Sequence, residues 1–308
     1  MRALILGARG AVGQATAEHI RALGHEVTPA GRNAPVGWAQ INLASPDGWR
    51  ELREVSGRYD VVVNATGVEE PRIVDATAGS LLVEISATAS YLDRLDPSAP
   101  IVLGAGLAPG LSTIMLASLD AQPGDELDLA VMLGGGEAHG AAAVAWTADL
   151  AGRALHRPPE RRDVYNLRES RAVRSPRGAR RYLRADFPDH LLLGNPGGYA
   201  VRTYLATDRR ISTAALELVG RIPRLRGLVR RAPHLGSDGW SLAARHRRTG
   251  REILAHGRGQ SETTARLTAY LADAAMRQQP SRGVTAADLV TLAEISRATG
   301  IQTEETSR

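Results

Sequence analysis

The sequence predicts an α/β fold, with a doubly wound parallel sheet in its first part and a second mixed α/β domain after it. Three observations lead to this prediction. Short apolar runs alternate with helical patterns, a glycine-rich turn joins the first run to the first helix, and both patterns change after Ala105. Strands that are apolar throughout are typical of a parallel sheet whose two faces are covered.

Residues 1–103 contain six apolar runs that we interpret as strands. One helical pattern stands out between the first two runs, because Val12, Ala15 and Ile20 repeat at close to helical spacing and Gly24 follows as a stop signal. The six predicted strands are Ala3–Leu6, His25–Pro29, Gln40–Leu43, Asp60–Asn64, Leu81–Ser86 and Ile101–Leu103.

The rest of the chain mixes helix and strand patterns. The arginine-rich residues 157–190 are predicted to form strands with a mobile connection, and the polar C-terminal residues are expected to fray. Thr285 and Asp288 resemble a capping box that starts one last helix, which Gly300 ends. The other predicted elements are helices over Leu111–Leu119, Ala141–Leu155, Ser212–Val219 and around Leu267–Ala274, strands over Leu127–Leu133 and Tyr199–Thr207, and a hairpin of Trp240–Arg247 with Glu252–His256.

The chain of 308 residues contains no lysine and no cysteine, so all 38 of its Lys and Arg positions are arginine. Without lysine there can be no Schiff-base nucleophile, no Walker-type phosphate loop and no Tyr-x-x-x-Lys pair of the short-chain dehydrogenases. Without cysteine there can be no thiolate nucleophile, disulfide, iron–sulfur cluster or zinc–thiolate site. We expect no metal in the site.

The net charge of +5 conceals a strong asymmetry along the chain. Residues 1–150 contain 9 arginines and 18 acidic residues, a net of −9, whereas residues 151–308 contain 29 arginines and 15 acidic residues, a net of +14. This difference indicates two parts with different roles.

Hydrophobic residues make up 43% of the chain, which is enough for a packed core. No apolar run approaches the roughly 18 residues that a membrane-spanning helix needs. The apolar start, Ala3–Leu6, is too short for the apolar region of a signal peptide. We therefore expect a soluble cytoplasmic protein with no membrane partner.

The strongest motif is Gly7-Ala8-Arg9-Gly10-Ala11-Val12-Gly13, which lies between the first predicted strand and the first predicted helix. In a Rossmann-type domain such glycines permit the tight turn, the approach of the backbone to a pyrophosphate and the close packing of helix on sheet. The pyrophosphate then lies at the helix N-terminus. The motif predicts dinucleotide binding, and the alternative is a glycine-rich turn in some other α/β protein.

The end of the second predicted strand favours NADP over NAD. An acidic residue usually receives the ribose hydroxyls of NAD at this point, but the chain has Gly31-Arg32-Asn33. An arginine there can form a forked, charge-assisted contact with a 2′-phosphate. We expect Arg9 to face the phosphates as well. The alternative is that Arg32 is an ordinary surface arginine.

Small and polar residues follow the fourth and fifth predicted strands. Asn64-Ala65-Thr66-Gly67 and Ser86-Ala87-Thr88 both stand where parallel strands end at their carboxyl side. Ligands bind at that edge in open α/β sheets. We therefore assign both stretches to the nicotinamide-ribose side of the cofactor, with a pair of ordinary turns as the alternative.

These stretches, together with Val83-Glu84-Ile85-Ser86, resemble those of the saccharopine dehydrogenase-like reductases. Gly104-Ala105-Gly106 followed by Pro109-Gly110-Leu111-Ser112 is the most specific part of the resemblance. It implies that Gly104 and Gly106 also belong to the cofactor site. The chain departs from the family at Val68, Glu84 and Thr88, and it lacks the lysine of the Lys–His pair that some saccharopine enzymes are thought to use.

The resemblance also implies a division of the chain into three parts. Residues 1–121 would form the NADP-binding Rossmann domain, and residues 122–260 would form a domain for substrate binding and dimerisation. Residues 261–308 would form C-terminal helices that pack back on the first domain. A homodimer is therefore expected.

The proton donor should be a His, Tyr or carboxylic acid. The prediction is His139, oriented by Glu137, because both follow a predicted strand and stand beside glycines that let a ligand approach. The alternative is a helix-capping loop with an exposed histidine.

The arginines of the second half have two interpretations. Arg168, Arg171, Arg174 and Arg202 are candidates for binding an anionic substrate, whereas most arginines there are expected to be solvated. No helix-turn-helix or aromatic stacking motif is present, so no nucleic-acid partner is expected.

The sequence thus predicts an NADPH-dependent oxidoreductase that reduces a C=N or C=O bond of a small, carboxylate-bearing metabolite. Imine reduction fits this description. The alternatives are a non-catalytic NADP-binding sensor and an enoyl reductase acting on a C=C bond.

Overall fold

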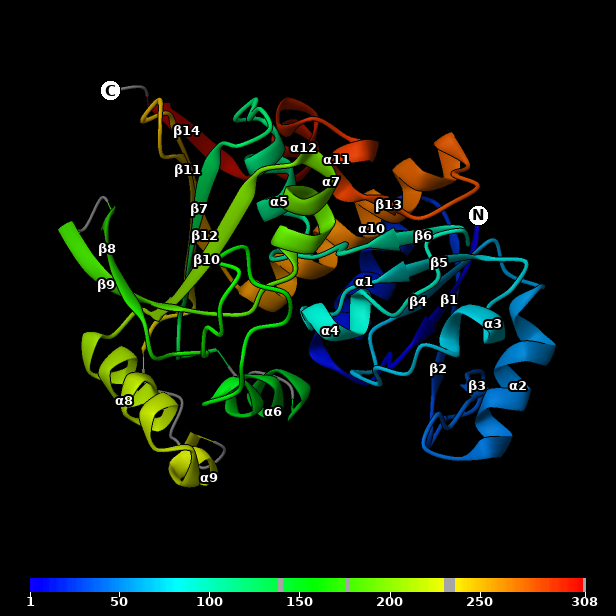
Figure 1. The fold of residues 1–308 in the computed structure, drawn as a ribbon. Helices are drawn as coiled ribbons and strands as arrows, with labels where there is room; N and C mark the ends of the chain where they lie inside the picture. Colours follow the sequence, from blue (N-terminus) through cyan, green and yellow to red (C-terminus); the bar gives the residue numbers. More distant parts are fainter. Residues whose placement is uncertain (138–140, 176–177, 230–235, 307–308) are drawn as a thin grey trace. The chain divides into compact units, whose positions relative to one another are not determined.

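The computed structural model describes residues 1–137, 141–175, 178–229 and 236–306 (Figure 1). The chain divides into two compact units. The first contains Met1–Leu111 and Ser261–Thr299, and the second contains Ser112–Gln260 and Gly300–Arg308. The helix α5 (Leu111–Ala117) therefore falls almost entirely in the second unit, whereas the sequence places the boundary after residue 121.

The first unit is built on a seven-stranded sheet in which every pairing is parallel. Its strand order is β13-β6-β5-β4-β1-β2-β3, so the order reverses at β1 as in a doubly wound dinucleotide-binding sheet. The strands are β1 (Arg2–Leu6), β2 (Glu26–Gly31), β3 (Ala39–Gln40), β4 (Val61–Asn64), β5 (Leu81–Glu84), β6 (Ile101–Leu103) and β13 (Val284–Thr285). The predicted fold class is confirmed.

The central strands β1, β4 and β5 are buried, apart from Arg2 at the start of β1. Leu4 and Ile5 of β1 and Val62 of β4 are all 0% exposed. Burial of consecutive residues requires cover on both faces, which is why these strands are apolar except at Arg2, Asn64 and Glu84, which lie at strand ends. The helices of this unit are α1 (Ala11–Ala22), α2 (Pro46–Ser56), α3 (Ile73–Ala76), α4 (Ala89–Leu92), α10 (Gln260–Gln278), α11 (Ala286–Leu289) and α12 (Leu292–Thr299).

The second unit contains a mixed sheet of seven strands in the order β14-β12-β11-β7-β10-β9-β8. Only β7 and β10 pair in parallel, and the other pairings are antiparallel. The strands are β7 (Glu126–Leu133), β8 (Ser170–Ser175), β9 (Gly178–Arg184), β10 (Ala200–Thr207), β11 (Gly239–His246), β12 (Glu252–Arg258) and β14 (Gln302–Thr306). Its helices are α5, α6 (Ala141–Leu150), a π-helix (His190–Gly194), α7 (Asn195–Gly197), α8 (Arg210–Arg221), a 3-10 turn (Pro223–Leu225) and α9 (Arg226–Val229).

Three predicted elements are wrong. The third strand is only Ala39–Gln40, because the buried Ile41 and Leu43 belong to the turn that enters α2. The last helix is divided, since the Thr285–Asp288 capping box starts α11 and the chain becomes extended at Val290 before α12 begins.

The third error concerns residues 302–306, which the sequence predicts to fray. Residues 302–306 form β14, which pairs antiparallel with β12 at the edge of the second sheet. Polar side chains are compatible with an edge strand, because it can leave one side in water.

No helix within the described ranges combines the length and apolar character needed to cross a membrane.

Candidate functional site

The glycine loop occupies the turn from β1 into α1, and its first and last glycines are required by close backbone contacts. Gly7 has a φ of +78°, and a Cβ on it would lie 2.5 Å from the carbonyl oxygen of Ala65. A Cβ on Gly13 would overlap the carbonyl oxygen of Gly7. No other residue fits either position without displacement of the backbone.

Gly10 is different, because the nearest atom to a Cβ there would be the carbonyl oxygen of Gly7 at 3.4 Å. It is the exposed N-cap of α1 and has an extended backbone and no capping side chain. The first hydrogen bond within the helix runs from Gln14 N–H to Gly10 O. In the described part of the chain, the N–H groups of Ala11, Val12 and Gly13 have no acceptor, as expected for a helix N-terminus.

The loop is joined to the end of β2. The N–H groups of Gly7 and Ala8 both donate to the carbonyl oxygen of Ala30, at 3.1 and 3.2 Å. Gln40 fixes the turn after β2, because its side chain donates to Arg32 O and accepts from Ala34 N–H. The residues predicted to contact the 2′-phosphate therefore begin at the same sheet edge as the glycine loop.

Arg9 and Arg32 both lie at this edge and both are exposed. Over the ranges that the structure covers, neither guanidinium is paired with a carboxylate. Asn33 is also exposed, and nothing surrounds the Cβ position of Gly31 within 4 Å. This edge thus presents two uncompensated positive charges beside an open helix N-terminus.

The stretch after β4 is held by the buried side chain of Asn64. Its Oδ1 accepts from both the N–H and the hydroxyl of Thr66, at 3.3 and 2.7 Å. Its Nδ2 donates to the carbonyl oxygen of Val68 at 3.2 Å. These bonds fix the turn of Ala65, Thr66 and Gly67, whose first residue contacts Gly7.

A buried carboxyl group, Glu84 at the end of β5, supports Asn64 in turn. Glu84 is 1% exposed and accepts from Asn64 Nδ2 and from the Tyr91 hydroxyl, both at 2.8 Å. It also accepts from the N–H of Ser86 at 2.9 Å. Burial raises the pKa of Glu84 to about 7, although the three hydrogen bonds favour the ionised form.

The Glu84 carboxyl also lies beside the Tyr91 hydroxyl and the turn that contains Ser86. Burial beside Glu84 raises the pKa of the Tyr91 hydroxyl, so that hydroxyl stays protonated and remains a donor. The hydroxyl of Ser86 donates to Glu69 at 2.6 Å and accepts from Thr88 N–H at 3.1 Å, which orders the turn containing Ala87. Glu84 is a residue that the sequence analysis did not single out as functional. The available signal was one carboxyl group at the end of an otherwise apolar strand.

Gly104 and Gly106 lie just after β6 and are buried. Gly104 has a φ of +72°, and its N–H donates to the carbonyl oxygen of Glu84 at 3.0 Å. Gly106 N–H donates to Pro109 O at 2.9 Å, across a loop that contains a cis peptide before Pro109. Both glycines thus shape the backbone next to β5.

The cofactor-binding residues predicted from the sequence all end or follow strands of one parallel sheet. Parallel strands end at a common edge, so these residues belong to one edge of the sheet.

The predicted proton donor, His139, lies outside the described residues. Glu137 is described, and its carboxylate accepts from the backbone N–H of Gln260 at 2.7 Å. This contact gives Glu137 a structural role where the second unit's main segment ends, and its role in orienting His139 remains a prediction.

Three of the four candidate substrate arginines are engaged inside the second unit. Arg202 pairs with Glu126 at 2.9 Å and with Glu160 at 3.1 Å. Arg171 pairs with Asp128 at 2.9 Å. Arg168 lies over the ring of Tyr165 and donates to the carbonyl oxygen of Gly220. These contacts favour a structural role for the three arginines. The side chain of the fourth candidate, Arg174, is not among those that the structure describes.

The second unit contains a buried acid–base group that the sequence did not indicate. Asp189 is 0% exposed and accepts from the hydroxyls of Ser112 and Thr113 at 2.9 and 2.8 Å. Burial raises its pKa. The ring of the adjacent His190 lies between the carbonyl oxygens of Phe187 and His156, at 2.9 and 2.7 Å. The two hydroxyl contacts join Asp189 to the first turn of α5, and its second carboxyl oxygen, Oδ2, is buried without a hydrogen-bond partner among the described residues.

The described residues contain no group of three or more His, Asp or Glu side chains arranged to hold a metal ion.

No family model and no curated protein matches the sequence. The resemblance to the saccharopine dehydrogenase-like reductases therefore stays a prediction. Among solved structures, the DAP dehydrogenase of C. glutamicum in complex with DAP is 15% identical, with a TM-score of 0.49 and 94% of each chain covered. An engineered D-amino acid dehydrogenase bound to NADP+ is 13% identical, with a TM-score of 0.48, and the match covers 96% of this chain and 98% of that one.

A meso-DAP dehydrogenase mutant of Clostridium tetani E88 with DAP is 12% identical, with a TM-score of 0.47 and the same coverage. At these identities the likeness concerns the course of the chain and does not extend to activity.

The buried Glu84 carboxyl makes stability depend on pH. Its pKa rises from 4.5 to about 7 on folding, so its contribution is fully present below about pH 4.5 and is lost as the pH rises through about 7. The shift in pKa corresponds to about 3 kcal/mol. We therefore expect the free energy of unfolding of the wild type to fall by about that amount as the pH rises, and we expect Glu84→Gln to lack this fall. Urea unfolding from pH 4.5 to 8 measures it, with the exposed Glu54→Gln on α2 as the matched control. An unchanged pH dependence in Glu84→Gln would show that this carboxyl does not change its protonation in that range.

Proposed function

We propose that the protein is an NADPH-dependent oxidoreductase. One observation carries the proposal. The N-terminus of α1, whose N–H groups have no acceptor, lies at the same sheet edge as Arg9 and Arg32, and neither arginine has a carboxylate partner among the described residues. The close contacts of Gly7 and Gly13 fix the turn around the exposed Gly10, which has no side chain of its own. This arrangement fits a pyrophosphate, which accepts hydrogen bonds from such N–H groups.

The preference for NADPH rests on charge. No acidic residue occurs between Glu26 and Asp47, so the chain lacks the carboxylate that would accept the ribose hydroxyls of NAD after β2. Arg32 is exposed and uncompensated at that point. Its guanidinium can form two parallel hydrogen bonds to a 2′-phosphate, and Arg9 can supply a second positive charge.

The residues after β4 and β5 would hold the nicotinamide side. Asn64 fixes the backbone of Ala65, Thr66 and Gly67, and Glu84 holds Asn64. Ser86 and Ala87 would border the same region, with Gly104 and Gly106 next to them. The cofactor, when bound, supplies a hydride, so the protein must provide position, electrostatics and a proton.

We further propose that the substrate is a small metabolite with a C=N or C=O bond and a carboxylate, in the manner of the saccharopine dehydrogenase-like reductases. The second unit would bind it, and two copies of the chain would form a homodimer. His139 would donate the proton, with Glu137 nearby.

A second candidate function is a non-catalytic NADP-binding sensor. One observation favours it: Arg168, Arg171 and Arg202, the arginines expected to receive the substrate, are engaged in contacts within the second unit. Oxidation of NADPH with a panel of oxo acids and amines separates the two candidates. Tight NADPH binding without turnover of any member would support the sensor.

Arg32→Ala tests the choice of cofactor. Loss of a charge-assisted contact of about 1.5–3 kcal/mol should weaken NADPH binding about tenfold or more, while NADH binding changes little. Calorimetric titration of both dinucleotides measures this, with the exposed Arg58→Ala of the same unit as the control. If Arg32→Ala changes both affinities equally, or neither, Arg32 does not bind the 2′-phosphate.

His139→Ala tests the proposed proton donor. If His139 donates the proton, the variant should lose turnover by about 100-fold and lose one limb of the pH–rate profile, because a general acid typically contributes a factor of that order. The exposed His256→Ala on β12 is the matched control. A pH–rate profile unchanged from that of the wild type would eliminate His139 as the donor.

A further inference from the structure

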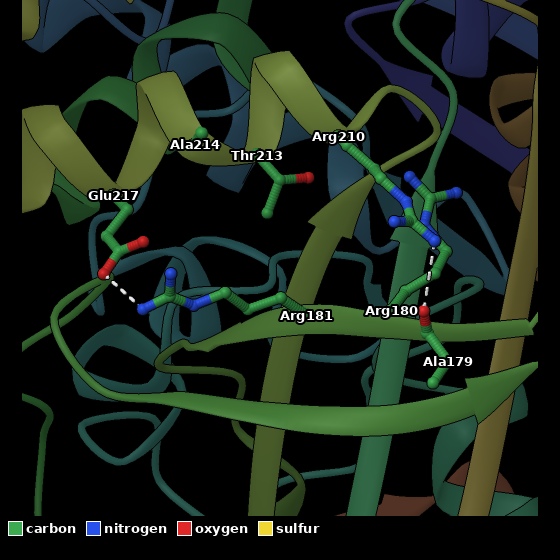
Figure 2. A pocket seen from close by; sticks show the side chains of 7 residues that line it. All are labelled: Ala179, Arg180, Arg181, Arg210, Thr213, Ala214 and Glu217. Atoms are coloured by element: carbon green, nitrogen blue, oxygen red, sulfur yellow. Dashed lines mark hydrogen bonds and ion pairs between the residues drawn. The ribbon is translucent and has the colours of Figure 1, made fainter.

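The second unit contains a pocket of about 180 Å³ along one side of α8, between that helix and β9 (Figure 2). It lies in the basic half of the chain, and none of the predicted site residues lines it. Three arginines line it, together with one carboxylate: Arg180 and Arg181 from β9, and Arg210 and Glu217 from α8.

The carboxylate of Glu217 is already neutralised. It accepts from Arg181 at 2.7 Å and from Arg221, one turn further along α8, at 2.8 Å. Figure 2 shows Glu217 and Arg181 pointing toward each other across the pocket, while Arg210 lies toward the other end of the helix. The remaining lining cations, Arg180 and Arg210, therefore receive no compensation from Glu217.

Arg180 is the unusual member, because it is only 8% exposed. Its Nη2 donates to the carbonyl oxygens of Thr207 and Asp208, at 2.8 and 2.6 Å. No carboxylate pairs with it in the ranges that the structure describes. Buried charges in proteins are usually paired, so a buried guanidinium held by two neutral carbonyls calls for an anion.

Arg210 adds a second cation with no carboxylate partner among the described residues. Its Nη2 donates to the carbonyl oxygen of Ala179, the residue next to Arg180, at 3.3 Å (Figure 2). This bond holds the Arg210 side chain against β9. Two guanidinium groups, each anchored by backbone carbonyls and each with further N–H groups, line one small pocket.

We propose that this pocket binds a small dianion, and specifically a phosphoryl group. Two guanidinium groups match the charge of a phosphate monoester, and the fork of each can donate two parallel hydrogen bonds to its oxygens. The pocket size admits a phosphoryl group and excludes a whole dinucleotide. Such a ligand would act as an effector of the second unit. Its site would be distinct from the proposed dinucleotide site of the first unit, which we call the dinucleotide edge and which contains Gly7–Gly13 and Arg32.

Titration with inorganic phosphate at constant ionic strength tests the proposal. Phosphate should bind the wild type, and Arg210→Gln should weaken this binding about tenfold or more, because it removes charge-assisted hydrogen bonds. Arg210 is exposed, so its replacement leaves the core intact. The exposed Arg58→Gln in the first unit, a matched change of charge, should leave phosphate binding unchanged.

Two further arms separate this pocket from the dinucleotide edge and from other anions. The Arg32→Ala protein should keep phosphate binding, and a loss there would assign the phosphate to the dinucleotide edge and overturn the proposal. Binding of succinate without phosphate would overturn the phosphoryl assignment. Equal phosphate binding by the wild type and Arg210→Gln, or no binding by either, would show that the pocket is not an anion site.

Discussion

The proposed dinucleotide site at the glycine loop depends on one steric constraint, the contact of the Gly7 backbone with the carbonyl of Ala65. A side chain at Gly7 would lie 2.5 Å from that oxygen, and a side chain at Gly13 would overlap the carbonyl of Gly7 itself. The end of β1, the turn after β4 and the first turn of α1 are therefore fixed against one another. The N–H groups of Ala11, Val12 and Gly13 have no acceptor among the described residues, and the proposed pyrophosphate site lies at these groups.

The same constraint connects the glycine loop to a buried carboxyl group. Ala65 follows Asn64, which Glu84 holds at 2.8 Å, and Glu84 is held in turn by Tyr91. Residues 1–150 carry a net charge of −9, but Glu84 is buried whereas Arg9 and Arg32 are exposed next to the glycine loop. Two positive charges therefore lie beside the glycine loop in a half of the chain whose net charge is negative, and a phosphate at that loop would meet them.

The sheet and the glycine loop could be predicted because their signals are local. Apolar runs and glycine spacing reflect neighbours within a few residues, and the strand order then follows from the doubly wound fold. The roles of the arginines could not be predicted, because the partners of Arg202 lie 76 and 42 residues away, at Glu126 and Glu160. The polar β14 was missed since an edge strand is stabilised by its pairing with β12 and needs no apolar pattern. Glu84 was hidden within an apolar strand, and only its burial distinguishes it.

Hydrogen exchange on addition of NADPH tests the proposed pyrophosphate site at the start of α1, because it reports on the backbone N–H groups that would bind the pyrophosphate. Exchange should slow at Ala11, Val12 and Gly13 when NADPH is present, while the edge strand β8 of the second unit, far from this loop in sequence, provides an internal reference. Protection should be confined to the glycine loop and the turns after β2, β4 and β5. Unchanged exchange at Ala11–Gly13 under saturating NADPH would contradict it.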